Sequence, residues 1–254
     1  MTPSLTMIVP ALNEEKHLSN TVHEAIDAID GLVSDYEILI FNDGSTDRTG
    51  EIAEALSQKN ARIHVIHHEI PRGLGYGYKA GVRLADKTHV LLVPGDNELR
   101  QDSIQDMCKN IGQADIVLTY ANNPEIRPLS RQFISRLFSG IVRKASGLKV
   151  RYFNGPALHR TDLVRRALTE VSDGFAYQAE ILVRMIQSGA TYVEVGMYLN
   201  ARPETSAFRM ANVINVFTNI IKLYYRLRWH KNPLVAPYTQ NLPMDIKHVG
   251  TLER

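Results

Sequence analysis

Acidic and amide side chains gather directly after three apolar stretches in the first half of the chain. These groups are Asn13-Glu14, Asp43 and the segment Asp96-Asn97-Glu98. If the stretches are parallel strands, the groups share the edge of the sheet where α/β proteins bind ligands. An unpaired carboxylate at the end of a buried strand is costly, so Asp43 is expected to face a ligand or the rim. The alternative is that Asp43 caps a helix beginning near Thr46.

Apolar stretches of strand length alternate with stretches of helical spacing and so predict the elements that would position these groups. Strands are predicted at residues 5–9, 36–41, 62–67, 89–93, 115–120 and 191–195. Helices are predicted at residues 14–29, 46–59, 73–85, 103–111, 131–146, 176–187 and 208–228. Continuously apolar strands alternating with helices indicate an α/β fold, with a mostly parallel sheet flanked by helices.

Composition narrows the class of protein. The chain has 254 residues, of which 44% are hydrophobic and 22% charged, as in ordinary globular proteins. A formal net charge of +2 is too small to suggest a nucleic-acid partner. The single cysteine, Cys108, excludes an internal disulfide, fits a reducing compartment and is expected to be inert. We found no signal peptide and no apolar run of about 18 residues, so we expect a cytoplasmic protein, soluble or resting on a membrane.

Three motifs follow one another in the first half of the chain. They are Val9-Pro10-Ala11-Leu12-Asn13-Glu14, Asn42-Asp43-Gly44-Ser45-Thr46-Asp47 and Arg72-Gly73-Leu74-Gly75. Their order resembles that of inverting glycosyltransferases of the GT-A fold. The sequence most resembles the family-2 branch that includes dolichyl-phosphate mannosyltransferases and polyprenyl-phosphate sugar transferases. The resemblance extends from residue 4 to residue 227 and implies a Rossmann-like GT-A fold.

The resemblance also implies a reaction. A sugar would move from a UDP- or GDP-sugar donor to a polyprenyl phosphate, or to another hydroxyl acceptor, with inversion. The alternative is a nucleotide-sugar-binding regulator or partner subunit without turnover. The residues that the resemblance assigns to the nucleotide are Pro10, Leu12, Glu14, Phe41, Asp43, Lys79, Gly95 and Asp96.

Asp96 and Glu98 are the predicted metal ligands. The resemblance implies a diphosphate leaving group, whose charge a hard cation held by carboxylates would neutralise. We therefore expect Mg²⁺ or Mn²⁺ as the cofactor, with Asp96 also assigned a catalytic role. The family usually carries Asp-x-Asp here, and its first position is Pro94 in this chain. The alternative is a turn whose acids are solvated.

The acceptor side is assigned by looser motifs. Arg131 and Ser135 keep a spacing that binds acceptor phosphate in the lipid-phosphate branch, and a guanidinium fork suits phosphate. Arg131 as a solvated helix charge is the alternative. Arg202 and Ser206 resemble a later part of the same motif.

The start of the helix at residues 176–187 resembles another part of the acceptor site. The resemblance assigns Gln178 to the acceptor, and Glu180 is expected to orient the acceptor or remove its proton. The alternative for Glu180 is a first-turn glutamate favoured by the helix dipole.

Residues 1–206 are expected to form the transferase domain, with a donor half at 1–120 and an acceptor half at 121–206. An amphipathic helix and a tail follow at 207–254. Lipid-using relatives rest such a helix on a membrane, which would place this protein at the cytoplasmic face. Core packing and a homodimer contact are the alternatives.

Overall fold

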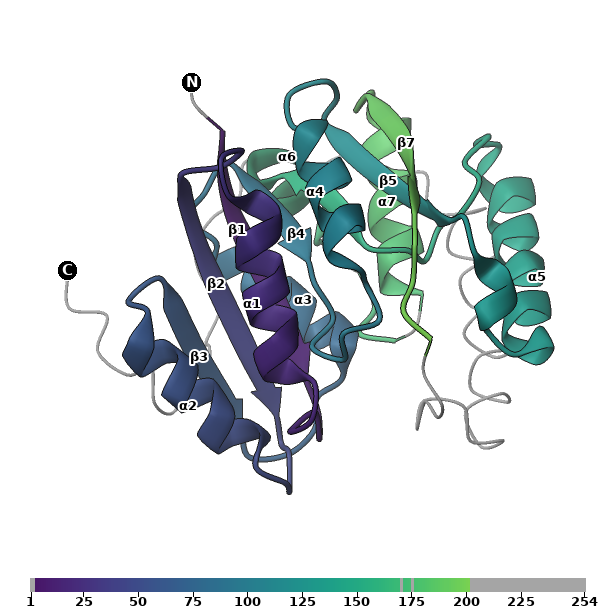
Figure 1. The fold of residues 1–254 in the computed structure, drawn as a ribbon. Helices are drawn as coiled ribbons and strands as arrows, with labels where there is room; N and C mark the ends of the chain where they lie inside the picture. Colours follow the sequence, from purple (N-terminus) through teal and green to yellow (C-terminus); the bar gives the residue numbers. More distant parts are fainter. Residues whose placement is uncertain (1–2, 170, 175, 202–254) are drawn as a thin grey trace.

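The computed structural model describes residues 3–201, with the exception of residues 170 and 175. Within this part of the chain, seven strands form one sheet in the order β3-β2-β1-β4-β6-β5-β7 (Figure 1). The strands are β1 (Ser4–Ala11), β2 (Asp35–Asp43), β3 (Ile63–His68), β4 (His89–Leu92), β5 (Ile116–Ala121), β6 (Ala157–Arg160) and β7 (Tyr192–Met197).

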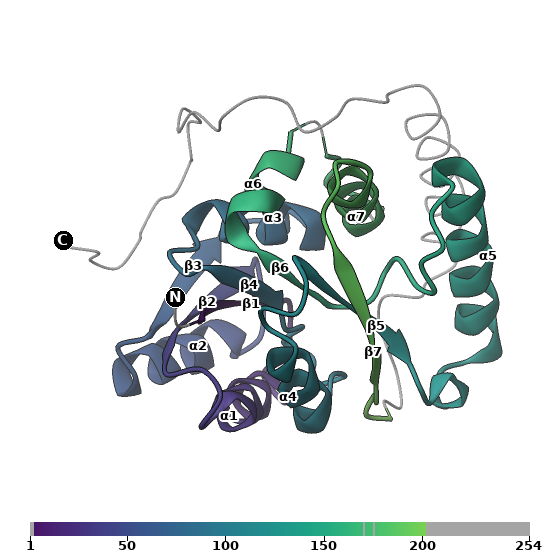
Figure 2. The ribbon, with the colours of Figure 1, turned by 90° about the horizontal axis from the view of Figure 1, so that it is seen from above.

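Helices cover both faces of the sheet (Figure 2). One face carries α1 (Leu18–Ile29), α2 (Thr49–Lys59) and α4 (Gln101–Lys109). The other face carries α3 (Leu74–Leu84), α6 (Thr161–Ala167) and α7 (Tyr177–Gln187). The 3-10 helix η1 (Pro124–Ile126) leads into α5 (Leu129–Ser146), which stands at the end of the sheet beyond β5 and β7.

Most strand pairs are parallel. β1 pairs with β2 and β4, β2 with β3, and β5 with β7. Only β6 runs against its neighbours, β4 and β5, among the strands described. The mostly parallel sheet flanked by helices confirms the predicted fold class. The amphipathic helix at 208–228 and the domain boundary at residue 206 lie outside the described residues.

The residues of β1 show why these strands are continuously apolar. Leu5, Met7 and Val9 pack with the helices of one face, whereas Ile8 packs with those of the other. All four are fully buried. Successive side chains of a strand point to opposite faces, so a sheet covered on both sides favours apolar residues at successive positions.

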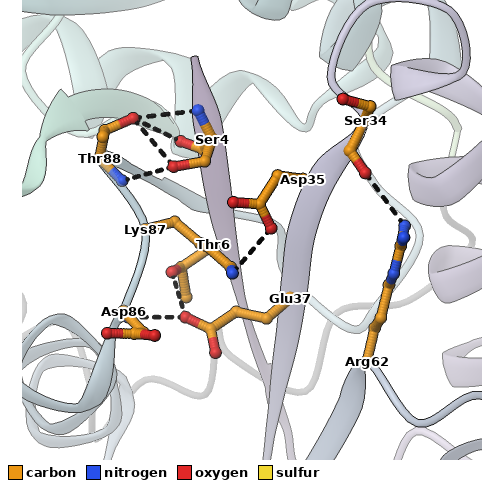
Figure 3. Close-up of polar contacts among 9 residues, drawn as sticks. All are labelled: Ser4, Thr6, Ser34, Asp35, Glu37, Arg62, Asp86, Lys87 and Thr88. Atoms are coloured by element: carbon orange, nitrogen blue, oxygen red, sulfur yellow. Dashed lines mark hydrogen bonds and ion pairs between the residues drawn. The ribbon is translucent and has the colours of Figure 1, made fainter. Parts of the chain in front are cut away.

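A polar network fixes the amino ends of β1 and β2 to the loop before β4 (Figure 3). The Thr6 hydroxyl donates to Glu37 Oε1 at 2.6 Å, and the Asp86 backbone N–H donates to the same oxygen at 2.7 Å. Lys87 Nζ lies 2.7 Å from Asp35 Oδ1. Thr6 is fully buried, so its hydroxyl needs this partner. These polar groups satisfy one another at the edge opposite the predicted site.

None of the helices in the described part of the chain is both long and apolar enough to cross a membrane. Cys108 on α4 is 5% exposed, and burial raises the pKa of its thiol to about 12. Its nucleophilic thiolate is therefore scarce at neutral pH.

Candidate active site

The loops after β1 and β2 are joined by side-chain hydrogen bonds. Asn13 Oδ1 accepts from the Thr46 N–H at 2.8 Å, and the Asn13 N–H donates to Ser45 Oγ at 3.0 Å. The Glu14 N–H donates to Thr49 Oγ1 at 2.7 Å. Asn13 has φ +57°, a left-handed conformation that asparagine tolerates better than most residues. The first two polar clusters thus share one edge of the sheet, as predicted.

The turn after β4 approaches the end of β1 closely. The Gly95 N–H donates to the Pro10 carbonyl at 3.0 Å, and Thr21 Oγ1 on α1 donates to the Gly95 carbonyl at 3.1 Å. A Cβ at position 95 would lie 2.9 Å from the Pro10 oxygen, so this contact requires glycine. It places Asp96 at the same edge as the β1 loop.

Asp43 is 8% exposed, and its carboxylate accepts three hydrogen bonds. Oδ1 accepts from His68 Nδ1 at 2.7 Å and from the Arg72 N–H at 2.9 Å, and Oδ2 accepts from the Gly73 N–H at 2.8 Å. Burial opposes ionisation, but these bonds and the charge of His68 outweigh it and hold the pKa of Asp43 below its ordinary value. Asp43 therefore ties β2 to the start of α3, and the alternative that it caps a helix near Thr46 is wrong.

Two predicted pocket residues differ in exposure. Leu12 is exposed at the rim, whereas Phe41 is fully buried beneath α3. The Phe41 ring centroid lies 6.0 Å from that of His68. Phe41 thus packs beneath His68, the partner of Asp43. Its direct contact with a nucleotide stays a prediction.

Lys79 and Glu180 hold the loop before α7 from two sides. Lys79 Nζ donates to the Val171 carbonyl at 2.8 Å and lies 2.5 Å from Asp173 Oδ1. The Glu180 carboxylate accepts from the Ser172 N–H at 3.1 Å and from its hydroxyl at 2.6 Å. Both Lys79 and Glu180 are buried. A phosphate or an acceptor could engage them only by competing with this loop, so their predicted substrate contacts stay predictions.

Gly75 on α3 faces the same loop, where a Cβ would lie 2.5 Å from the Asp173 carbonyl oxygen. We expect Gly75→Ala to lower the free energy of unfolding by about 1–3 kcal/mol, since backbone must shift to admit the methyl group. Gly140→Ala on α5 is the matched control, because its Cβ would meet nothing within 4 Å. The control should be neutral or stabilising by up to ~1 kcal/mol. Urea denaturation compares the two, and equal effects would contradict a tightly held loop.

Gln178 fixes the start of α7. Its side chain is buried, and Nε2 donates to the Gly155 carbonyl in the turn before β6. A Cβ on Gly155 would lie 2.6 Å from Thr119 Oγ1, so this turn also depends on glycine. Gln178 thus already has a structural partner, and its contact with an acceptor stays a prediction.

Glu98 lies between two arginines that approach from the chain around α5. Arg127 Nε donates to Glu98 Oε1 at 2.8 Å, and Arg131 Nη2 donates to Oε2 at 3.1 Å. The Glu98 N–H donates to Asp96 Oδ1 at 3.0 Å. The turn at 96–98 thus connects the predicted metal ligand Asp96 with the predicted acceptor residue Arg131. Ser135 is half-buried one turn further along α5.

The ligands at hand limit how a cation could bind. In the described part of the chain, no three His, Cys, Asp or Glu side chains converge as a metal site. Glu98 would have to leave two guanidinium groups to serve as a ligand. Mg²⁺ is commonly held by one or two carboxylates, with substrate phosphates and water completing its shell. Asp96 fits that role when a diphosphate supplies further oxygens.

Sequence reasoning missed two residues that organise this edge. Arg127 pairs with Glu98, and His68 pairs with Asp43. The polar end of each strand was the available signal, but the pairing depends on the register of β2 with β3, in which Asp43 stands opposite His68. Arg202 and Ser206, the other predicted acceptor residues, lie outside the described residues.

A mostly parallel sheet flanked by helices, with polar loops converging at its carboxyl edge, is the architecture of the Rossmann-like GT-A fold. The model of the family "Glycosyl transferase family 2" matches residues 6–171. The chain therefore belongs to glycosyl transferase family 2, as the motifs at 9–14 and 42–47 had indicated.

The curated relatives match this chain over different shares of their length. It is 36% identical to the glycosyltransferase EpsJ of Bacillus subtilis over 46% of this chain and 33% of that protein. It is 25% identical to EpsH of the same organism over 78% of this chain and 60% of that protein. It is 27% identical to the undecaprenyl-phosphate mannosyltransferase of Micrococcus luteus over 74% of this chain and 80% of that protein. The chain thus spans a third of EpsJ and three fifths of EpsH.

A solved structure shares the fold. Glucosyl-3-phosphoglycerate synthase from Mycobacterium tuberculosis, in complex with UDP, superposes with a TM-score of 0.67 at 16% identity. The match covers 89% of this chain and 80% of that one. The same enzyme was also solved with Mn²⁺, UDP and phosphoglyceric acid. At this identity the likeness concerns the fold.

Proposed function

We propose that this chain is a glycosyltransferase that moves a sugar from a UDP- or GDP-sugar to a polyprenyl phosphate, or to another hydroxyl acceptor, with inversion. The observation that carries the proposal is the convergence of the loops after β1, β2 and β4, with Gly95 packed on Pro10 beside Asp96. Family membership and the UDP bound to the M. tuberculosis enzyme support the donor. The name of the M. luteus relative, an undecaprenyl-phosphate mannosyltransferase, supports a polyprenyl-phosphate acceptor. A place at the cytoplasmic face of a membrane is part of the same proposal.

Asp43 retains the capacity to bind the nucleotide. A carboxylate offers about four acceptor positions, and the structure shows three bonds to Asp43, of which Oδ2 accepts one. We propose that Oδ2 also accepts a hydrogen bond from the base or ribose. Leu12 and Glu14 on the neighbouring loop would line the same pocket. The short bonds of Asp43 to the start of α3 would keep its carboxylate correctly oriented.

In the reaction, the acceptor oxygen would attack the anomeric carbon opposite the departing nucleoside diphosphate. A divalent cation, when bound, neutralises charge on that leaving group. Asp96 would hold it, and Glu98 would orient Arg127 and Arg131 toward an acceptor phosphate. A phosphate oxygen is largely ionised at pH 7 and needs no base. With such an acceptor, Glu180 would act by holding Ser172 rather than by removing a proton.

A thermal-shift screen tests the donor. The full chain would be heated with UDP, GDP and their sugars, with and without Mg²⁺ or Mn²⁺. A ligand of the native state at 100 times its Kd stabilises the protein by about 2.7 kcal/mol. Because the proposed cation bridges the protein to the diphosphate, the cognate nucleotide should raise Tm clearly with metal and only slightly without it. Transfer of labelled sugar to polyprenyl phosphate would complete the assignment. Nucleotide binding without transfer to any acceptor would favour the alternative, a nucleotide-sugar-binding regulator or partner subunit without turnover.

A further inference from the structure

The outward face of α5 combines exposed apolar and basic side chains. Leu129 is 81% exposed and Phe133 is 66% exposed, and they lie one turn apart. The same spacing continues along the face with Arg136, Gly140 and Arg143, followed by Lys144. The three basic residues are exposed, and a Cβ at Gly140 would meet nothing within 4 Å. No element of the described part of the chain therefore covers this face along its length.

The charge of this helix is of one sign. Residues 129–146 contain four basic residues and no acidic one. Arg131 turns inward to Glu98, whereas Arg136, Arg143 and Lys144 form no ion pair within the described residues. Exposed large apolar residues usually occur singly. An apolar pair followed by three unneutralised cations matches the headgroup region of an anionic bilayer.

We propose that the outward face of α5 docks on an anionic lipid bilayer, with Leu129 and Phe133 inserted and Arg136, Arg143 and Lys144 at the headgroups. This inference deepens the proposed function, because it names the surface from which a lipid acceptor would be taken. It draws on α5 and is independent of the helix predicted at 208–228.

The position of α5 relative to the site supports a lipid bilayer over other occupants. Arg131 and Ser135 lie on the opposite side of the helix from Leu129 and Phe133, at the turn that holds Asp96. A helix with its side chains is about 10–12 Å across. The acceptor phosphate would thus travel about one helix diameter from the headgroup plane to Arg131. Docking by this face would turn the predicted acceptor residues toward the lipid supply.

Co-sedimentation of the full chain with vesicles tests the proposal without any turnover. Vesicles of phosphatidylcholine with roughly one third phosphatidylglycerol should bind the chain, and neutral vesicles should bind it far less. Leu129→Ser with Phe133→Ser should weaken binding at least about tenfold, since each residue inserts apolar surface. Replacing Arg136, Arg143 and Lys144 by glutamine should weaken it about fivefold per charge and reduce its dependence on salt.

Ile70→Ser is the matched control, because Ile70 is 65% exposed but lies in the loop between β3 and α3 rather than on α5. It should bind vesicles like the unaltered chain. Unaltered binding of the Leu129/Phe133 variant, or no binding by the full chain, would overturn the proposal. A concentration-dependent dimer that Phe133→Ser abolishes would assign the face to a second copy and also overturn it. If the Leu129/Phe133 variant loses vesicle binding but neither it nor the unaltered chain transfers sugar to polyprenyl phosphate, the docking face is supported and the proposed acceptor is refuted.

Discussion

Asp96→Asn is expected to lower kcat about 100-fold or more while leaving Tm within a degree or so of the unaltered chain. Asparagine keeps a side-chain oxygen that can accept from the Glu98 N–H, so the turn at 96–98 should persist. It loses the negative charge that would hold a divalent cation against a diphosphate. Transfer assays over a range of Mn²⁺ concentrations measure the effect, and excess metal should restore part of the rate.

Asp102→Asn provides the control for the Asp96 substitution. Asp102 is a half-exposed carboxylate six residues further on, paired with Arg100 at 2.6 Å. Its substitution should leave kcat unchanged. Full activity in EDTA, or a wild-type rate in Asp96→Asn, would refute the metal role. Neutralisation of the diphosphate would then have to come from basic side chains such as Arg72, and Pro94 would mark a metal-independent form of the site.

Asp43→Asn is expected to lower the free energy of unfolding by about 2–3 kcal/mol and to weaken nucleotide binding as well. The amide oxygen can replace Oδ1 as the acceptor for His68 and Arg72. The amide NH₂ group would then face the Gly73 N–H, where Oδ2 accepts at 2.8 Å, and that donor would lose its partner. Urea denaturation and calorimetry with the cognate nucleotide measure the two effects. An unchanged stability would mean that the carboxylate does not anchor α3.

The same substitution has a defined dependence on pH. The pKa of Asp43 is lower in the folded chain than its ordinary value of 3.8. Its stabilising contribution is therefore complete above that value and is lost as the pH falls through the folded pKa. The stability difference between the unaltered chain and Asp43→Asn should shrink as the pH falls below 3.8. A difference that persists in acid would assign the effect to shape rather than charge.

The sequence predicts the carboxyl edge of the sheet well because the relevant signals are local. Apolar runs stopped by Pro10, Asp43 and Pro94 place the ends of β1, β2 and β4, and right-handed connections bring those ends together. The strand β6 was not predicted, because its four residues, Ala157–Arg160, end in a histidine and an arginine and form no apolar run. Its antiparallel direction also lies outside the alternating pattern of strand and helix.

The partners of the buried charges could not be predicted in the same way. Lys79 and Val171 are 92 residues apart, and Glu98 and Arg131 are 33 apart. No periodicity relates positions so distant, and which carboxylate meets which cation depends on the packed structure. For this reason the sequence alone does not predict that Asp43 bonds to His68 and to the start of α3. The residue types predict where the site lies, whereas the partners of each charged side chain can be identified only from the folded structure.

The burial of Cys108 gives this chain a practical advantage as a target for site-specific fluorescent labelling. It is the single cysteine of the sequence, and with a thiol pKa of about 12 it should be almost unreactive toward maleimides at neutral pH. A cysteine introduced at the exposed position of Phe133 would then carry the dye alone, without prior removal of native thiols. The emission of an environment-sensitive dye at that position would report directly whether it passes from water into a lipid phase.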